Sequence, residues 1–516
     1  MAEKHLEIEL KFDAAAGFAV PELTGLPGVS GATEPETHEL LASYFDTRDL
    51  RLAARGITLR RRRGGPDAGW HLKMPAGADS RTEMRAPLGR AQIVPSRLAS
   101  LVAAHTRGEP LVPVATLDTE RTVVRLLDGE GATLAEIADD LVTGRVLNEG
   151  DDASGTAWRE IEVELGAGDP ELLKAAGKRL RKAGASRASS ASKLGRLMDG
   201  HIARPTPAEI GAAVRTRSGT AGDAVLAYLV AQVEAMLEYD PKARLAEDDA
   251  VHRMRVATRR IRSLLQSYAP VLDTKRTDPV KPELKWLAAA LGEVRDLEVL
   301  RMRFTERLRV AGHEETPGWL DDIARRERGA YRRLNAALKE PRYYALLNDL
   351  EALIADPPLD ARAARADVAE LPRLVERAWK RMETAHAGIA GSDDAETARH
   401  DTRKAAKRAR YAAEVASPVL GEPALQAAKN AKRIQEVLGG YQDGVIAMET
   451  LESAAARVRD TAEAFTLGVL YGIEQCESRA WLDRLEGTWA ATPAPVFPKP
   501  VKEAKAAKGD RKQARK

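Results

Sequence analysis

The chain has 516 residues, enough for about two to four domains at roughly 100–200 residues each. Charged residues make up 30%, but their signs nearly cancel at +3, so the overall charge identifies no partner. The single cysteine, Cys476, excludes an internal disulfide and a Cys-x-x-Cys metal pair, and 4% aromatic residues argue against base-stacking surfaces for nucleic acid. A charged N-terminus and the lack of a long apolar run predict a cytoplasmic protein without a membrane span.

Short runs of alternating apolar and polar residues fill residues 1–200. They predict strands at residues 5–12, 56–63, 70–75, 121–127, 132–140 and 158–165. Several short strands at this spacing favour a sandwich or a barrel. A helix is predicted at Glu171–Arg181, before a final segment at residues 189–197.

The composition changes after residue 200. Proline, glycine and small polar residues predict a linker at residues 201–222. Long stretches rich in Ala, Leu, Arg and Glu predict a helical domain at residues 223–490. Proline and lysine then predict a disordered basic tail at residues 491–516.

Charged residues gather on single faces of the predicted strands, because alternate side chains of a strand share a face. These faces carry Glu7, Glu9 and Lys11; Arg60 and Arg62; His71 and Lys73; and Glu160, Glu162 and Glu164. One interpretation is a solvent-exposed sheet face with opposite charges paired across strands. Against it, like charges along one strand repel each other, and surface ion pairs contribute little to stability. Clustered carboxylates can hold Mg²⁺ or Mn²⁺, while arginine and lysine hold phosphate oxygens. A metal–polyphosphate complex needs both groups in one cavity.

The run Glu7-x-Glu9-x-Lys11 resembles the motif that marks the CYTH, or triphosphate tunnel metalloenzyme, family. Further segments match in the family's order: Tyr44–Thr47, Leu59–Arg62, Leu72–Lys73, Arg81-x-Glu83, Glu160-x-Glu162 and Ser192–Lys193. The likeness covers roughly residues 4–200. Two positions depart from the pattern: His71 stands where the family often has threonine, and Arg85 where a second acid is common.

The resemblance implies a closed antiparallel tunnel of eight strands with Mg²⁺ or Mn²⁺ as cofactor. It implies phosphate binding by Lys11, Arg60, Arg62, Lys73 and Lys193, and metal binding by Glu7, Glu9, Glu160 and Glu162. Arg121 is expected to face inward beside the phosphates; Glu136 and Asp140 are expected beside the metal, with Asp139 as the alternative to Asp140. Glu7, Glu9, Lys11, Glu160 and Glu162 are the expected catalytic residues, and the choice of base among the carboxylates is open.

A motif recurs in the helical half, which predicts two duplicated halves. The repeated residues are His252, Arg255, Arg259, Arg262 and Lys285 in one copy, and His400, Arg403, Lys407, Arg410 and Lys432 in the other. On a helix, the first four of each copy fall within about 80° of arc, a stripe that contains no acid. A solvated charged face is the alternative, but like charges at this spacing cost helix stability. A shared polyanionic ligand explains why the stripe is kept.

The second halves of the repeats also match, because Leu291-Gly292 precedes Asp296 as Leu438-Gly439 precedes Asp443. Together these segments resemble the CHAD domain, a helical domain named for its histidines, over about residues 215–490. The resemblance implies polyphosphate binding by the ten repeated residues in a basic groove. Whether the two aspartates orient basic side chains or cap helices is left open.

The fold class expected is a multidomain α+β protein: an eight-stranded antiparallel tunnel followed by an all-α domain of two repeated helical halves. The expected function is metal-dependent hydrolysis of inorganic triphosphate, with polyphosphate bound by the helical domain. A non-catalytic polyphosphate-binding protein and a CYTH-type adenylate cyclase are the alternatives. Nucleic acid and membrane are not expected partners, the oligomeric state is open, and polyphosphate binding would permit association with polyphosphate granules.

Overall fold

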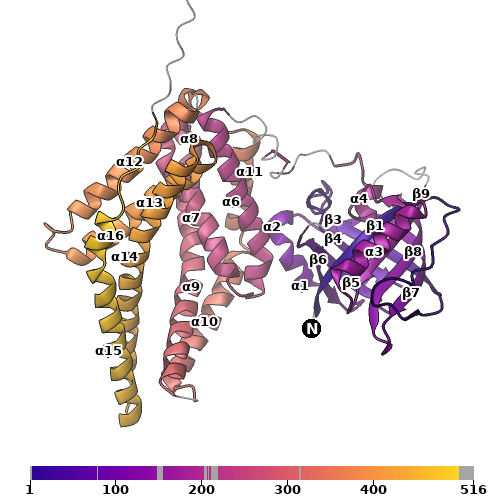
Figure 1. Cartoon of the computed structure of the whole chain (residues 1–516), viewed down its shortest axis with the longest axis horizontal. Coiled ribbons are helices and arrows are strands. Elements are labelled where there is room, and N and C mark those ends of the chain that lie inside the picture. Colours follow the sequence, from indigo (N-terminus) through magenta and orange to yellow (C-terminus); the bar gives the residue numbers. More distant parts are fainter. Residues whose placement is uncertain are drawn as a thin grey trace, which may run out of the picture. The chain divides into compact units, whose positions relative to one another are not determined.

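The computed structural model describes residues 3–77, 80–147, 155–202, 206, 209–210, 219–312, 315–365 and 367–498. The chain divides into two compact units, residues 1–206 and 207–516, both drawn in Figure 1. Most of the predicted linker and most of the predicted tail lie outside the described residues, so their boundaries remain predictions.

Eight strands of the first unit close into an antiparallel barrel, which confirms the expected tunnel. The ring runs β1-β6-β5-β4-β3-β7-β8-β9, and β9 pairs back with β1. Its strands are β1 (Glu3–Ala14), β3 (Glu36–Asp46), β4 (Thr58–Arg63), β5 (Gly69–Pro75), β6 (Ser80–Ala86), β7 (Val112–Leu127), β8 (Thr133–Val146) and β9 (Thr156–Leu165). Short β2 (Gly31–Ala32) and β10 (Ser186–Arg187) add to β7 and β1. Closure leaves no open edge among the eight.

Two ring strands, β3 and β6, are missing from the six runs that alternation predicted. The end of β3 is buried on both faces, so Tyr44, Phe45 and Asp46 break the alternating pattern. Strands β7 and β8 are also longer than predicted, because both continue along the wall of the barrel.

Helix α3 (Pro170–Lys182) lies on the outside of the barrel (Figure 1), and part of the barrel turns apolar side chains toward it. Phe12, Ile161 and Val163 pack against Leu172 and Leu180 there. The helix begins one residue before the predicted Glu171, and the Asp169 side chain caps it by accepting from two backbone N–H groups. Each buried leucine contributes about 1.5–3 kcal/mol relative to exposure. Since β1, β7, β8 and β9 commit one face to this packing, their alternate, charged face lines the tunnel.

A short helix, α4 (Lys193–Leu197), carries the last predicted tunnel residue. The Ser192 hydroxyl caps it by accepting from Gly195 N at 2.9 Å. Leu194 and Leu197 pack into a second apolar cluster with residues of β7 and β8. This packing holds Lys193, the first residue of α4, inside the unit. Helices α1 (Ser96–Leu101) and α2 (Ala103–Thr106) and a 3-10 turn at Ala53–Arg55 complete the described elements of the unit.

The second unit is helical and is built in two halves (Figure 1). The first half contains α6 (Ala221–Arg244), α7 (Ala250–Ser267), α8 (Thr274–Thr277), α9 (Val280–Val310), α10 (Gly318–Ala337) and α11 (Pro341–Ala355). The second contains α12 (Asp367–Ala387), α13 (Ala395–Leu420), α14 (Glu422–Ala455), α15 (Thr461–Asp483) and α16 (Leu485–Ala490). Short 3-10 turns lie at Ala269–Val271 and Ala361–Ala364.

The two halves repeat one packing pattern. Helix α7 packs between α6 and α9, and α13 packs between α12 and α14. The halves meet where α7 contacts α13, and the buried Tyr268 hydroxyl donates to the Ala412 carbonyl at 2.7 Å. Helix α7 has a buried face, since Met254 and Ile261 are fully buried. Among the described helices, none combines the length and apolar content that a bilayer crossing requires.

Candidate functional site

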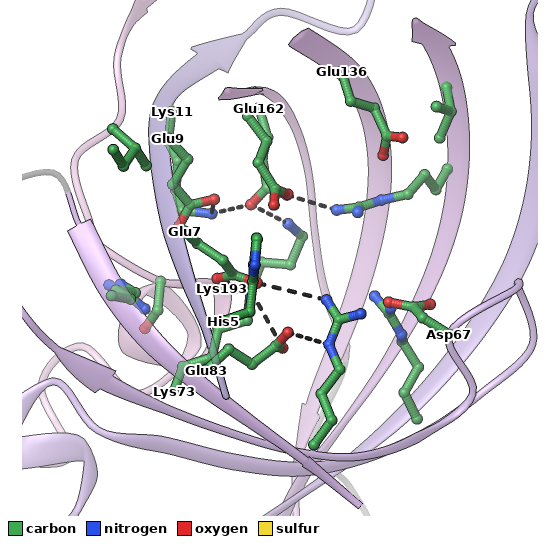
Figure 2. Close-up of a pocket in the computed structure, with 18 of the residues that line it drawn as sticks. His5, Glu7, Glu9, Lys11, Asp67, Lys73, Glu83, Glu136, Glu162 and Lys193 are labelled. Atoms are coloured by element: carbon green, nitrogen blue, oxygen red, sulfur yellow. Dashed lines mark hydrogen bonds and ion pairs between the residues drawn. The ribbon is translucent and has the colours of Figure 1, made fainter. Parts of the chain in front are cut away.

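A cavity of about 490 Å³ lies inside the barrel, and Figure 2 shows acidic and basic side chains converging on it. The predicted tunnel residues that line it are Glu7, Glu9, Lys11, Arg60, Arg62, Lys73, Arg121, Glu136, Glu162 and Lys193. Asp140 and Glu160, also predicted, do not belong to its lining. Side chains from at least six strands therefore share one enclosed space, as the strand alternation predicted.

Lys193 explains the position of Asp140 and Glu160. Its Nζ lies 2.8 Å from Asp140 Oδ2, 2.6 Å from Glu160 Oε1 and 2.8 Å from Glu162 Oε1. Burial alone would lower the pKa of Lys193, but the three carboxylates outweigh it and raise that pKa. These carboxylates lie within 4.8 Å of one another, close enough to hold a metal ion. In this structure the three carboxylates surround the Lys193 ammonium group.

Glu162 pairs with three basic side chains of the cavity. Arg121 Nη2 lies 2.6 Å from Glu162 Oε2 and donates to Asp140 Oδ2 at 2.6 Å, while Lys11 contacts the other Glu162 oxygen. Burial opposes ionisation of Glu162, but Lys11, Lys193 and Arg121 hold its pKa well below the usual range. Glu162 is therefore ionised and orients the basic side chains around it.

A second group of carboxylates is less well balanced. The register places Glu9 beside Glu164, and Glu164 beside Glu136, on β1, β9 and β8. Burial, together with Glu7 and Glu9, raises the pKa of Glu164 to about 7. Burial also raises the pKa of Glu7, although Lys73 Nζ lies 2.6 Å from it. The raised pKa values indicate that too little positive charge surrounds Glu7 and Glu164 to stabilise their ionised forms.

This second group fits a divalent cation. Mg²⁺ and Mn²⁺ prefer oxygen ligands, and an added cation would stabilise the ionised forms of Glu7 and Glu164, which burial and, to a smaller extent, neighbouring carboxylates disfavour. Glu164 was not among the predicted ligands, although it shares a strand face with Glu160 and Glu162. Strand alternation alone would have found it.

The basic wall of the cavity comes from β4. Arg60 Nη1 lies 3.4 Å from the Tyr44 hydroxyl, and no carboxylate of the described residues forms an ion pair with Arg60. Arg62 contacts Asp67, and burial, Arg60 and Arg121 lower its pKa to about 9. In the ring order, three strands separate β4 from β9 on either side. The arginines of β4 therefore lie opposite the carboxylates of β9.

The two departures from the CYTH pattern meet at Glu83. His71 Nδ1 lies 2.8 Å from Glu83 Oε1, Lys73 Nζ lies 3.8 Å from the same oxygen, and Arg85 contacts Oε2. Burial opposes its ionisation, but His71, Lys73 and Arg85 hold the pKa of Glu83 low. Glu83 is thus engaged by basic side chains rather than left open to a cation.

A basic groove of about 670 Å³ lies among α7, α9, α13 and α14 of the helical unit. The predicted residues that line it are His252, Arg255, Arg259, His400, Arg403, Lys407 and Arg410. Arg262, Lys285 and Lys432 do not belong to its lining; Lys285 and Lys432 are exposed, and Lys432 Nζ lies 3.2 Å from Glu436 Oε1. Arg295 and Arg303 line the groove and were not predicted. Arg295, Val299 and Arg303 follow one another at intervals of four residues, a spacing that places them on one face of a helix.

The duplicated Leu-Gly-x-x-x-Asp segments support the groove arginines. Arg255 Nη2 lies 3.5 Å from Asp296 Oδ1, and Arg403 Nη2 lies 3.5 Å from Asp443 Oδ1. Both aspartates lie in helix interiors, so they orient arginines rather than cap helices. In both arginines the Nε atom is buried without a hydrogen-bond partner in the described structure.

Cations in the groove outnumber the acids that face them. Burial, followed by Arg403, Arg259 and Arg255, lowers the pKa of Lys407 to about 6. Burial and neighbouring basic groups likewise lower the pKa values of His252 and His400. An anion in the groove would remove this repulsion.

The closed tunnel and the duplicated helical unit define a two-module protein with one charged site in each module. A family model described as the CYTH domain matches residues 5–198, and one described as the CHAD domain matches residues 227–452. An uncharacterized protein of Mycobacterium tuberculosis, Rv2226, is 37% identical over 504 residues, which cover 94% of this chain and 95% of that protein. The chain therefore belongs to the family in which a CYTH domain precedes a CHAD domain, and both resemblances are confirmed.

Solved structures resemble the units singly. PptA from Streptomyces chartreusis is 23% identical with a TM-score of 0.44, covering 53% of this chain and 100% of its own. The CHAD domain from the plant Ricinus communis is 24% identical with a TM-score of 0.43, covering 54% and 94%. HpAC1 from Hippeastrum, described as a putative adenylyl cyclase with a dominant triphosphatase activity, is 18% identical with a TM-score of 0.23, covering 39% and 98%. The CYTH family comprises triphosphatases and cyclases.

Proposed function

We propose that the tunnel binds inorganic triphosphate together with Mg²⁺ or Mn²⁺ and hydrolyses it, and that the helical groove binds polyphosphate. One observation carries the first part: the arginines of β4 and the carboxylates of β9 lie on opposite sides of one cavity inside the closed barrel. Charges of both signs in an enclosed site suit a ligand that is itself an anion carrying cations. The membership of a family that includes triphosphatases supports this choice.

The basic residues would hold the phosphate oxygens. Arg60 has no carboxylate partner among the described residues, so a phosphate can bind its guanidinium without breaking an ion pair. Lys11, Lys73 and Lys193 reach the cavity from β1, β5 and α4. Because these charges are fixed before substrate enters, they can stabilise charge that develops on the oxygens during phosphoryl transfer.

The carboxylates would hold the cation. Glu7, Glu9, Glu136 and Glu164 line the cavity from the adjacent strands β1, β8 and β9, and Glu162 lines it beside Lys11. When bound, the cation would neutralise charge on the phosphate oxygens and lower the pKa of a coordinated water molecule. Asp140 and Glu160 keep Lys193 charged and in place. Asp140, Glu160 and Glu162, all predicted metal ligands, lie within 4.8 Å of one another and offer the cation a second set of oxygens.

The decisive experiment is a substrate panel. Phosphate release is measured from triphosphate, longer polyphosphate, thiamine triphosphate and ATP, with Mg²⁺, Mn²⁺ or EDTA. Release from triphosphate that needs a divalent cation supports the proposal. Binding without release under every condition would support a non-catalytic polyphosphate-binding protein, and cyclic AMP from ATP would support a cyclase.

For the groove, the supporting observation is a set of basic side chains from both halves, with arginine Nε atoms buried and unpartnered. The test measures polyphosphate binding at about 0.2 M salt with DNA as competitor, because nonspecific DNA binding weakens steeply with salt. Displacement of polyphosphate by DNA at that salt would contradict the proposal.

A further inference from the structure

The loop between β4 and β5, residues 64–68, is held tightly against β3. Gly64 has φ 81°, and a Cβ atom there would lie 1.9 Å from the carbonyl oxygen of Glu39. Gly65 has φ 69°, and a Cβ atom there would lie 2.9 Å from Leu40 Cδ2. Only glycine allows both the left-handed backbone and the close approach. These two glycines therefore fix the backbone path of the loop.

A buried histidine fixes the end of this loop. His71 Nε2 lies 2.9 Å from the carbonyl oxygen of Asp67 and donates to it, while Nδ1 lies 2.8 Å from Glu83 Oε1. The imidazole is 1% exposed, so it cannot exchange these partners for water without moving. Pro66 and Asp67 line the tunnel cavity, and Figure 2 shows Asp67 at its edge. The backbone thus delivers the Asp67 carboxylate to the cavity.

The carboxylate of Asp67 forms an ion pair with Arg62. The Arg62 side chain is 5% exposed and Asp67 is 30% exposed, so the aspartate is the partner that can withdraw into water. Arg60, two residues earlier and on the same strand face, has no such partner among the described residues. Because burial, Arg60 and Arg121 disfavour the charge on Arg62, an anion beside it stabilises the tunnel before substrate arrives.

We infer that Asp67 is a built-in anion: its carboxylate occupies the place of a substrate phosphate on Arg62, and substrate must displace it. Asp67 thereby sets the affinity of the tunnel for phosphate anions, favouring those with enough charge to compete for Arg62. The inference rests on the proposed function, which supplies the phosphate anion. Asp67 acts through Arg62 and is a positioning residue, not a group that touches the reacting atoms.

A double-mutant cycle in the full-length protein tests this inference. The four proteins are wild type, Asp67→Asn, Arg62→Gln and the double variant. Binding of inorganic triphosphate is measured by calorimetry in EDTA, and kcat and KM are measured with Mg²⁺. The helical groove is unchanged in all four, so any triphosphate that it binds cancels from the comparison.

Asp67→Asn is expected to tighten triphosphate binding by about 3- to 10-fold, as the loss of about 0.7–1.4 kcal/mol of competition gives. The change should fall in KM rather than in kcat. In the Arg62→Gln background, Asp67→Asn should have no effect on triphosphate binding. Asp67→Glu keeps a carboxylate in the loop and should bind triphosphate more weakly than Asp67→Asn does. Without ligand, Asp67→Asn should unfold at lower temperature, and triphosphate should raise its Tm more than that of wild type.

Weaker triphosphate binding by Asp67→Asn would overturn the inference, because Asp67 would then orient Arg62 for substrate rather than compete with it. An equal effect of Asp67→Asn with and without Arg62 would also overturn it, since the aspartate would be acting through the loop alone. Triphosphate binding that is unaffected by Asp67→Asn removes this inference and leaves the proposed function standing. A wild-type tunnel that binds no triphosphate removes both.

Discussion

Arg403 Nη2 lies 3.5 Å from Asp443 Oδ1, and a Cβ atom on Gly439 of the same helix would lie 3.2 Å from that nitrogen. The duplicated pair, Arg255 and Asp296, has the same 3.5 Å separation. Gly292 lies below Arg255, where a Cβ atom would lie 3.5 Å from its Nε. In each half, glycine makes room for the guanidinium, and an aspartate one helical turn further along holds it. Both halves therefore keep the same contact between arginine, aspartate and glycine as well as the basic charge.

The groove should lose polyphosphate when its charges are reversed. Replacing Arg255, Arg259, Arg403 and Lys407 by glutamate should weaken polyphosphate binding by more than about 100-fold, since each reversal removes an attractive charge and adds a repulsive one. Binding is measured by calorimetry, and hydrolysis of triphosphate in the tunnel should continue. Arg262→Glu is the matched control, because Arg262 lies on the same helix but does not line the groove. Equal losses from Arg262→Glu would show that the contact surface lies elsewhere.

Polyphosphate binding should strengthen as pH falls from 8 to 7. Lys407 has a pKa of about 6 in the empty groove, so it is neutral there at pH 8. A bound polyanion favours the ammonium form, so binding takes up a proton and the affinity rises by up to about tenfold per pH unit until pH falls to about 6. Lys407→Arg keeps the charge and should bind tightly at pH 8 with little dependence on pH. Burial and neighbouring basic groups lower the pKa values of His252 and His400 as well, so both imidazoles are neutral in the empty groove at pH 8. A wild-type affinity that is constant from pH 8 to 7 would contradict this assignment.

Removal of a tunnel carboxylate should separate the two modules. Glu7→Ala or Glu9→Ala should reduce cation-dependent triphosphate hydrolysis on the order of 100-fold or more, while polyphosphate binding by the groove is unchanged. EDTA should have the same selective effect on the wild type. Glu130→Ala is the control, because Glu130 is an exposed acid outside the cavity lining. Variants that stay folded yet lose hydrolysis and polyphosphate binding together would refute the division into two modules.

Two glycines of the second half should respond oppositely to alanine. A Cβ atom on Gly440 would lie 2.5 Å from the Trp481 ring, so Gly440→Ala should destabilise the helical unit by about 1–3 kcal/mol. A Cβ atom on Gly468 would have no neighbour within 4 Å, so Gly468→Ala in α15 should stabilise it by about 0.5–1 kcal/mol. Urea unfolding followed by circular dichroism measures both. Equal effects of the two substitutions would contradict the packing of α15 on α14.

Alternation and helical spacing by themselves determined which face of each element carries charge. They placed Glu7, Glu9 and Lys11 together and separated the basic stripe of α7 from its buried side, because these patterns follow from the geometry of one strand or one helix. Chain order and local motifs were enough to indicate a tunnel followed by a duplicated helical domain. The six strong alternating runs were found in this way, whereas β3 was hidden by burial on both faces near its end.

Only the tertiary structure decided which residues of a charged face reach the shared space. Asp140 and Glu160 point inward, yet Lys193 engages them, and Arg262 belongs to the stripe of α7 yet lies outside the groove. Glu164 entered the cavity lining, and Asp67 reached Arg62. Local periodicity gives the direction of a side chain from its own backbone, but contacts between charges depend on distances set by strand closure, helix packing and loop course. Those distances arise from residues far apart in the chain.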